Sequence, residues 1–222
     1  MCGRFLLVDI EKVPERFNVK IYESSHLRKR YNISPGQPVQ IIFQESPNRM
    51  EEAKWGLIPH WAKDPSIGNK MINARAESLF EKPSFRDSLI KRRCLIPANG
   101  FYEWKKEGSD KIPYLIHLKD FSLFAFAGIY DLWEDERGNL IRTFTIITTS
   151  ANSLMKDIHD RMPVILKREE EEIWINKKEK NIRKLLDLLK PYPAELMSAY
   201  TVSKKINNPK YDSEDLIKPF NY

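Results

Sequence analysis

Polar residues with well-known chemistry interrupt the apolar segments of this sequence at four places. These are MCGR at 1–4, INARAES at 72–78, NGFYEW at 99–104 and DIHDRMP at 157–163. Together the four segments supply a thiol, an amide, a carboxyl and an imidazole, groups that nucleophilic and acid–base catalysis rely on. The thiol belongs to Cys2, directly behind Met1, and this position gives the cysteine an option that no other position offers.

Cys2 becomes the amino terminus when Met1 is removed, which is usual before a small residue. It then carries an amine and a thiol on one residue. An α-amine has a pKa near 7.7–8.0 against about 10.4 for lysine, so far more of it is neutral and nucleophilic at pH 7. The amine can form an imine with an aldehyde, and the neighbouring thiol can close the imine to a thiazolidine. The alternative is a small buried or incidental cysteine, although chain ends are usually frayed and polar.

Three further candidates each have a structural interpretation beside a catalytic one. Asn73 is either a turn or strand-end residue or a fixed amide that orients the terminal amine or a substrate oxygen. Glu103 is either exposed on an alternating strand or, between a tyrosine and a tryptophan, a carboxyl whose raised pKa suits a general acid. His159 is either a residue at a surface helix end or, flanked by aspartates, a tuned acid or base.

Arginines lie close to three of these candidates. Arg4, Arg75 and Arg161 are each within two residues of one of them, which suggests phosphate contacts, although each alone reads as a surface charge. Trp61 ends the segment WGLIPHW at 55–61, whose proline favours a loop. A loop tryptophan can stack on an exposed base, whereas one of the two tryptophans in this segment is expected in the core.

The scaffold that would hold these residues is predicted to be α+β. Apolar, β-branched and aromatic runs predict strands at 39–43, 113–118, 123–133 and 143–149, the last two joined by a hairpin at Gly138-Asn139. Helices are expected in FRDSLIKRR behind a Ser84 cap, in 150–159 behind Ser150 or Asn152, and as two short helices before Pro191. Strands and helices do not alternate regularly, which favours an antiparallel sheet or open barrel in one domain over 1–222.

Composition narrows the classes of function. The chain has 222 residues, enough for a real core, and a net charge of +6, which fits a polyanion partner but is shared by many ordinary proteins. The only cysteines are Cys2 and Cys94, no CxxC or HExxH occurs, and the four histidines are scattered, so we expect no metal and no cofactor, with Cys94 in the core. Neither a secretory signal nor an apolar run of about 18 residues is visible, so we expect a cytoplasmic protein without membrane contact.

Seven motifs occur together and in order: MCGRF, YNISPGQ at 31–37, WGLIPHWA at 55–62, INARAES, CLIPANGFYEWKK at 94–106, IHDRMPVIL at 158–166 and VSKKINN at 202–208. In this combination the sequence resembles the SRAP family, first called SOS-response-associated peptidases. The resemblance runs from residue 1 to about residue 217. It implies a compact α+β domain with a mainly antiparallel, barrel-like β core flanked by helices.

The resemblance also implies a function and a partner. The family senses abasic sites in single-stranded DNA, where the terminal cysteine forms a thiazolidine crosslink with the ring-opened sugar and shields the damaged strand. Carried over, Cys2 is the nucleophile, Asn73 positions the terminus and the sugar, and Glu103 and His159 handle protons. A lyase or autoproteolytic peptidase activity can accompany the crosslinking. The expected protein is a monomer that joins the nucleoid during DNA damage.

A path for DNA follows from the same resemblance. The residues expected to line it are Arg4, Asn32, Pro35, Trp61, Arg75 and Arg161. Two local departures from the family pattern are mild: His60 precedes Trp61 where some relatives carry another aromatic, and Met162 follows Arg161. Neither departure removes a catalytic group, though both could adjust contacts with DNA.

Three alternatives remain beside this interpretation. Class II glutamine amidotransferases also begin with MCG and use a terminal cysteine as an N-terminal nucleophile, but their glycine- and arginine-rich glutamine-binding motifs are not visible here. Proteolysis would serve to remove a propeptide; only Met1 precedes Cys2, so we expect no self-cleavage beyond methionine removal. A plain single-strand binding module would leave the four candidate catalytic residues unexplained.

Overall fold

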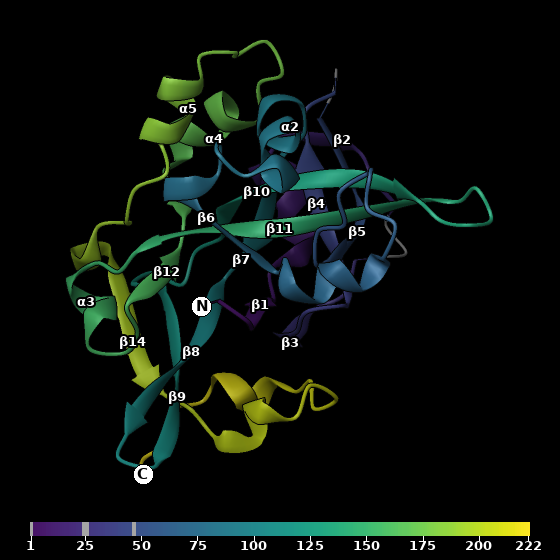
Figure 1. Ribbon diagram of the computed structural model, residues 1–222. Helices are drawn as coiled ribbons and strands as arrows, with labels where there is room; N and C mark the ends of the chain where they lie inside the picture. The colour runs from purple at the N-terminus through teal and green to yellow at the C-terminus, as the bar shows by residue number, and fades with distance from the viewer. Residues whose placement is uncertain (1, 24–26, 46–47) are drawn as a thin grey trace.

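The computed structural model describes residues 2–23, 27–45 and 48–222, and its strands form two sheets (Figure 1). In the first sheet every neighbouring pair is antiparallel. Its strand order is β14 (Met197–Thr201), β9 (Asp110–Leu118), β8 (Gly100–Glu107), β1 (Phe5–Leu7) and β3 (Arg30–Ile33).

The second sheet closes on itself. Its strand order is β12 (Arg161–Pro163), β11 (Leu140–Ser150), β10 (Phe124–Glu134), β7 (Arg93–Ala98), β4 (Pro38–Phe43), β5 (Asn48–Trp55) and β2 (Val19–Ile21), while β13 (Ile165–Leu166) pairs with β10 and β6 (Asn73–Arg75) with β11. A parallel pairing of β11 with β5 joins the path into a ring of β11, β10, β7, β4 and β5. The predicted α+β class with a mainly antiparallel, barrel-like core is therefore confirmed.

The central strand β10 shows why this ring forms. Its sequence FAFAGIYDLWE is buried at nearly every position, the pattern of a strand covered on both faces. Gly128 lies in its middle, where an added Cβ would come within 2.2 Å of Ile96 Cδ1 and 3.1 Å of Cys94 Sγ. Only glycine allows β10 to lie this close to the side chains of β7.

Phe5 ties the two sheets together close to the amino end. It belongs to β1 of the first sheet, yet its ring packs edge-on against Trp55 and Phe126 of the ring-forming strands, at centroid distances of 5.2 and 5.7 Å. Full burial of such a side chain contributes about 1.5–3 kcal/mol, before the aromatic contacts are added. This anchor fixes the backbone three residues after Cys2.

Short helices complete the fold. The α-helices are α1 (Val13–Arg16), α2 (Pro83–Lys91), α3 (Ser153–Lys156), α4 (Arg168–Ile175) and α5 (Ile182–Asp187), and the 3₁₀ helices are η1 (Ile10–Lys12), η3 (Pro65–Lys70), η4 (Ala76–Ser78), η5 (Ala194–Leu196), η6 (Lys204–Asn207) and η7 (Glu214–Ile217). Helices α2 and α4 pack on β7 and β10, and Figure 1 shows them at the end of the molecule away from the β8–β9 hairpin.

Most predicted elements are confirmed. The strand runs correspond to β4, β9, β10 and β11, and the 134–139 turn joins β10 to β11 with Gly138 at φ +81°. Asn152, not Ser150, caps α3 by accepting a hydrogen bond from the Met155 N–H. The two short helices before Pro191 are α4 and α5.

The helix in FRDSLIKRR differs from its prediction at both ends. Lys82 is the N-cap and Pro83 opens α2, because proline's fixed φ suits the first helical position, so Ser84 lies inside the first turn and was the wrong cap. The helix ends at Lys91 because the buried Arg93 starts β7. The Arg93 guanidinium donates hydrogen bonds to the carbonyls of Leu89, Trp174 and Asn176. These bonds connect the end of α2 to α4 and to the residue after it, and they require Arg93 to leave the helix.

Candidate functional site

Cys2 lies fully buried, three residues before the Phe5 anchor, and belongs to the main hydrophobic core cluster. Cys2 and Cys94 are both free thiols, and Cys94 is a core residue of β7, as predicted. Burial raises the pKa of the Cys2 thiol well above its usual range, and the charge of Glu103 raises it further. The sulfur is therefore held as a neutral thiol next to a carboxyl group. The expected removal of Met1 concerns a residue outside those that the structure describes.

Glu103 is on β8, opposite Tyr114 of β9, and only 4% of it is exposed. Loss of solvation on burial raises its pKa, while nearby positive charge, including that of His159, works in the opposite direction. The raised pKa predicted for this carboxyl is thus confirmed in its direction. The raised pKa favours the protonated carboxyl, which is the form that can act as a general acid.

His159 follows helix α3 and is held by its backbone and its ring. Its N–H donates to the Met155 carbonyl at 2.8 Å, and its Nδ1 accepts the Arg161 backbone N–H at 3.0 Å. The neutral ring therefore carries its proton on Nε2. In the protonated ring, Nδ1–H faces the Asp160 carboxylate, whose Oδ1 is 2.8 Å from Nδ1. Both protonation states thus have a ready partner for Nδ1.

Glu103 and His159 line one pocket of about 500 Å³, together with Trp104, Lys106, Lys111 and Asn207. The indole N–H of Trp104 donates to Asn207 Oδ1 at 2.8 Å, which fixes this wall of the pocket. Lys106, Lys111 and Asn207 were not predicted as site residues. The two lysines that follow FYEW in the sequence could have indicated Lys106. Lys111 is brought to the pocket by the pairing of β9 with β8, and Asn207 by helix η6, so neither could be predicted from its sequence neighbours.

Asn73 opens β6, which pairs with β11 so that Asn73 is in register with Ile146. Its Nδ2 donates to the Ile72 carbonyl at 2.9 Å. Its Oδ1 is buried and accepts no hydrogen bond from the described residues. A buried amide oxygen without a donor is costly, so Asn73 offers an acceptor that an incoming N–H or O–H would satisfy.

Arg75 and Arg161 flank the end of β11 from its two sides. Arg75, on β6, pairs in register with Thr148 of β11. Arg161, on β12, pairs in register with Ser150 of the same strand. Arg75 is exposed, whereas Arg161 grips the exposed Glu77 with both terminal nitrogens, at 2.6 and 2.9 Å. The fork of Arg161 is thus occupied by a carboxylate, a group with the same bidentate geometry as a phosphate.

Arg4 and Asn32 act as a unit. Arg4 Nη1 donates to Asn32 Oδ1 at 2.9 Å and to the Ile206 carbonyl at 3.1 Å. Asn32 is 1% exposed, and its Nδ2 donates to backbone carbonyls such as that of Tyr211. Its contribution to a surface is therefore indirect, through the orientation of Arg4. Pro35 sits in the turn after β3 and is half-buried.

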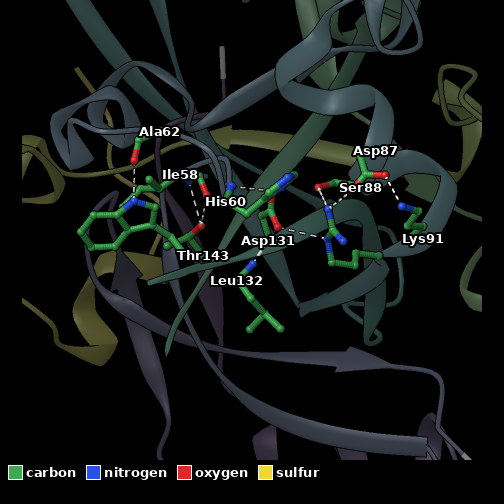
Figure 2. Close-up of polar contacts among 11 residues, drawn as sticks. Ile58, His60, Ala62, Asp87, Ser88, Lys91, Asp131, Leu132 and Thr143 are labelled. Atoms are coloured by element: carbon green, nitrogen blue, oxygen red, sulfur yellow. Dashed lines mark hydrogen bonds and ion pairs between the residues drawn. The ribbon is translucent and has the colours of Figure 1, made fainter. Parts of the chain in front are cut away.

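Trp61 belongs to a loop whose backbone is hydrogen-bonded by three side chains; Figure 2 shows these bonds at Ile58, His60 and Ala62. The Ile58 N–H donates to Thr143 Oγ1 at 2.8 Å, the His60 N–H donates to Asp131 Oδ2 at 3.0 Å, and Trp133 Nε1 donates to the Ala62 carbonyl at 2.7 Å. The Trp61 side chain itself is 53% exposed. His60 thus anchors the loop through its backbone N–H. Its ring adds a second contact, because Nδ1 lies 3.1 Å from Asp131 Oδ2.

No group of three or more His, Cys, Asp or Glu side chains is arranged to hold a metal ion in the part of the chain that the structure covers. Within the same residues, no helix combines the length and the apolar character needed to cross a membrane.

Comparison with known proteins shows which family the chain belongs to. The family model described as SOS response associated peptidase (SRAP) matches residues 1–209. Abasic site processing protein YoqW of Bacillus subtilis is 50% identical over 98% of this chain and 99% of its own length, and abasic site processing protein HMCES of Gallus gallus is 33% identical over 82% of this chain and 60% of its own. An X-ray structure of a Bacteroides thetaiotaomicron protein, 34% identical, superposes with a TM-score of 0.91 over 99% of this chain and all of that one. The chain belongs to the SRAP family.

Proposed function

We propose that this protein captures abasic sites in single-stranded DNA through a covalent bond to Cys2. Relatives that share a third to a half of its residues are named abasic site processing proteins. The observation that carries the proposal is the position of Glu103. Its charge acts on the Cys2 thiol and interacts with His159, and Glu103 and His159 line the same pocket.

The reaction uses both nucleophiles of Cys2, and removal of Met1 frees the amine. The amine attacks the aldehyde carbon of the ring-opened sugar, and loss of one water gives an imine. The sulfur then attacks the same carbon while the thiol proton passes to the nitrogen, which closes a five-membered thiazolidine. One C–N and one C–S bond form for each water released, so the step needs neither oxidant nor reductant.

Glu103 and His159 divide the proton transfers, and Asn73 holds one of the reacting groups. Glu103, whose protonated form burial favours, protonates the sugar ring oxygen as the ring opens. His159, with its proton on Nε2 in the neutral ring, exchanges protons at the anomeric oxygen. Asn73 Oδ1 accepts a hydrogen bond from the amine or from a sugar hydroxyl. Each acid–base group is expected to speed the reaction by about 10²–10⁴-fold.

The strand is held by cations and by one exposed aromatic. Arg75 and Arg161 contact phosphates, with Glu77 giving way at Arg161, and Arg4 is presented by Asn32. Trp61 stacks on a base that the loss of pairing has exposed. Pro35 borders the path at the turn after β3.

Intact mass spectrometry of the protein mixed with single-stranded DNA that holds one abasic site tests the proposal. The expected product has the summed mass of the two molecules less one water, survives denaturation and does not form with undamaged DNA. Cys2→Ala is expected to abolish it, whereas Cys94→Ala, which removes the other buried thiol, keeps it. Full adduct with Cys2→Ala, or none with the wild type, contradicts the proposal.

Cys2→Ser separates the two nucleophiles of the same residue. The amine remains, so borohydride is expected to trap an imine. The hydroxyl does not close the same stable ring, so the adduct without borohydride is expected to be lost on denaturation. A serine variant that formed an equally stable adduct would show that sulfur takes no part.

A further inference from the structure

We infer that Lys106 and Lys111, on the β8–β9 hairpin, bind a DNA phosphate next to the sugar under attack. The inference rests on the proposed function and adds a second phosphate-binding position to it. Arg75 and Arg161 belong to strands of the ring-forming sheet, whereas the two lysines belong to the other sheet. The strand would thus be held by residues of both sheets.

The hairpin places the two ammonium groups together. Glu107 pairs with Asp110 across the two-residue turn that contains Gly108, at φ +60°, and this register puts Lys106 directly opposite Lys111. Side chains of directly opposite residues start with their Cβ atoms about 4.5–5.5 Å apart, and like charges in that position destabilise a sheet. An anion bound between the two lysines would offset this repulsion, which accounts for two like charges at opposite positions.

The neighbouring charges of the hairpin are neutralised, which sets this pair apart. Lys105 Nζ lies 3.2 Å from Glu107 Oε1, and Asp110 Oδ1 lies 3.8 Å from Lys204 Nζ. Among the residues that the structure describes, neither Lys106 nor Lys111 forms an ion pair within 4.0 Å. Both are exposed, and both line the pocket of Glu103 and His159.

The chemistry of the pocket identifies the anion as a phosphodiester. The abasic sugar carries a phosphate on each side, so a pocket that receives the sugar beside Glu103 must also take at least one of them. Lysine ammonium groups act as mobile point charges and suit a phosphate whose orientation changes as the sugar ring opens. The fixed Trp104 wall gives the sugar an apolar surface on the same side.

The salt dependence of noncovalent binding to undamaged single-stranded DNA tests the inference. Each lost phosphate contact lowers the slope of log K against log salt by about 0.7, so Lys106→Gln with Lys111→Gln, which removes the one proposed contact, is expected to lower it by about 0.7. Lys105→Gln with Lys119→Gln removes the same charge from β8 and from the residue that follows β9, and serves as the matched control. Equal slopes for the two double variants contradict the inference. Thermal unfolding is expected at an unchanged or higher temperature in the test variant, because the repulsion is relieved.

An oligonucleotide with one neutral methylphosphonate linkage beside the abasic site locates the contact. The wild type is expected to crosslink it more slowly at low protein concentration than the normal strand, and the lysine double variant is expected to treat the two strands alike. If the double variant still distinguishes them as strongly as the wild type does, the contact lies elsewhere. Wild-type crosslinking to the normal strand is measured in the same series, so failure of the proposed function is told apart from failure of this inference.

Discussion

Asp131 is predicted to control DNA affinity without touching DNA. Its carboxylate is 3% exposed and lies under the Trp61 loop, where it accepts the His60 N–H at 3.0 Å and faces His60 Nδ1 at 3.1 Å. Its other oxygen accepts the Leu132 N–H at 2.8 Å and pairs with Arg92 Nε at 3.1 Å (Figure 2). One buried carboxylate therefore joins the loop to strand β10 and to the end of α2.

The cost of removing this carboxylate follows from its partners. Breaking a buried ion pair typically destabilises a protein by about 3–5 kcal/mol, because the remaining charge and donors lose their partner. Arg92 keeps a second ion-pair partner, since its Nη2 lies 2.5 Å from Asp87 Oδ2. The expected loss therefore lies at the lower end of this range. For Asp131→Ala we expect a loss of about 3 kcal/mol in unfolding free energy, or a fall of about 6–12 °C in Tm for a chain of this size.

Asp131→Asn is the variant for binding, because it keeps the shape and one acceptor oxygen while it removes the charge. A base stacked on an aromatic contributes about 1–3 kcal/mol, and a loosened loop is expected to forfeit about 1 kcal/mol of this, so the Kd for single-stranded DNA rises about fivefold. Asp135→Asn is the control: it removes the same charge from the exposed turn of the same hairpin. Fluorescence anisotropy at constant salt measures both.

A double-mutant cycle decides whether the effect passes through Trp61. In a Trp61→Ala background, Asp131→Asn is expected to change the Kd no further, because the ring that it positions is gone. Equal losses in the two backgrounds would refute the reasoning, as would an Asp135→Asn effect of the same size. Crosslink yield at saturating DNA is expected to stay at the wild-type level, since Cys2 and Glu103 are untouched.

Two further predictions concern carboxylates near the proposed DNA path. Glu77→Gln frees the Arg161 guanidinium and is expected to tighten DNA binding by up to about fivefold, since an exposed ion pair contributes about 0.2–1 kcal/mol. Glu81→Gln removes the same charge nearby and is the control. An equal gain in affinity for Glu81→Gln would contradict the role of Glu77. Burial raises the pKa of Glu103, so the contribution of this group to stability is fully present below the ordinary glutamate pKa and is lost as pH rises through the raised one. Glu103→Gln lacks this contribution, so the difference in unfolding free energy between the two proteins is expected to change over that range. Urea unfolding at a series of pH values measures this difference, and parallel curves for the two proteins would contradict it.

Local patterns in the sequence were enough for the long strands β4, β9, β10 and β11 and for the environment of Glu103. Runs such as TFTIITT at 143–149 leave few alternatives to a strand, and a carboxyl inside FYEW has apolar neighbours on both sides. Both features depend on residues adjacent in the chain. The family resemblance supplied the grouping of Cys2, Glu103 and His159, since no local pattern joins positions 2, 103 and 159.

Features that depend on contacts between residues far apart in the chain could not be predicted from the sequence. Asn32 reads as a loop residue in YNISPGQ, yet it is buried because Arg4 and carbonyls near residue 211 surround its amide. Asp131 gives no signal inside a strand, and its partner His60 lies 71 positions away. The Lys106–Lys111 pair requires the register of β8 on β9, which the turn at Gly108 sets.

Burial of the Cys2 thiol determines the order in which the two nucleophiles of the proposed reaction act. Because burial, and then the charge of Glu103, raise the pKa of this thiol, the sulfur remains protonated and is a weak nucleophile at neutral pH. An α-amine of ordinary pKa is about a tenth neutral at pH 7, so it attacks the aldehyde first. Transfer of the thiol proton to the imine nitrogen, which Glu103 can relay, puts a positive charge close to the sulfur and so lowers the cost of the thiolate. Ring closure then becomes favourable only after an aldehyde has been bound, and a buried thiol that meets no aldehyde stays unreactive.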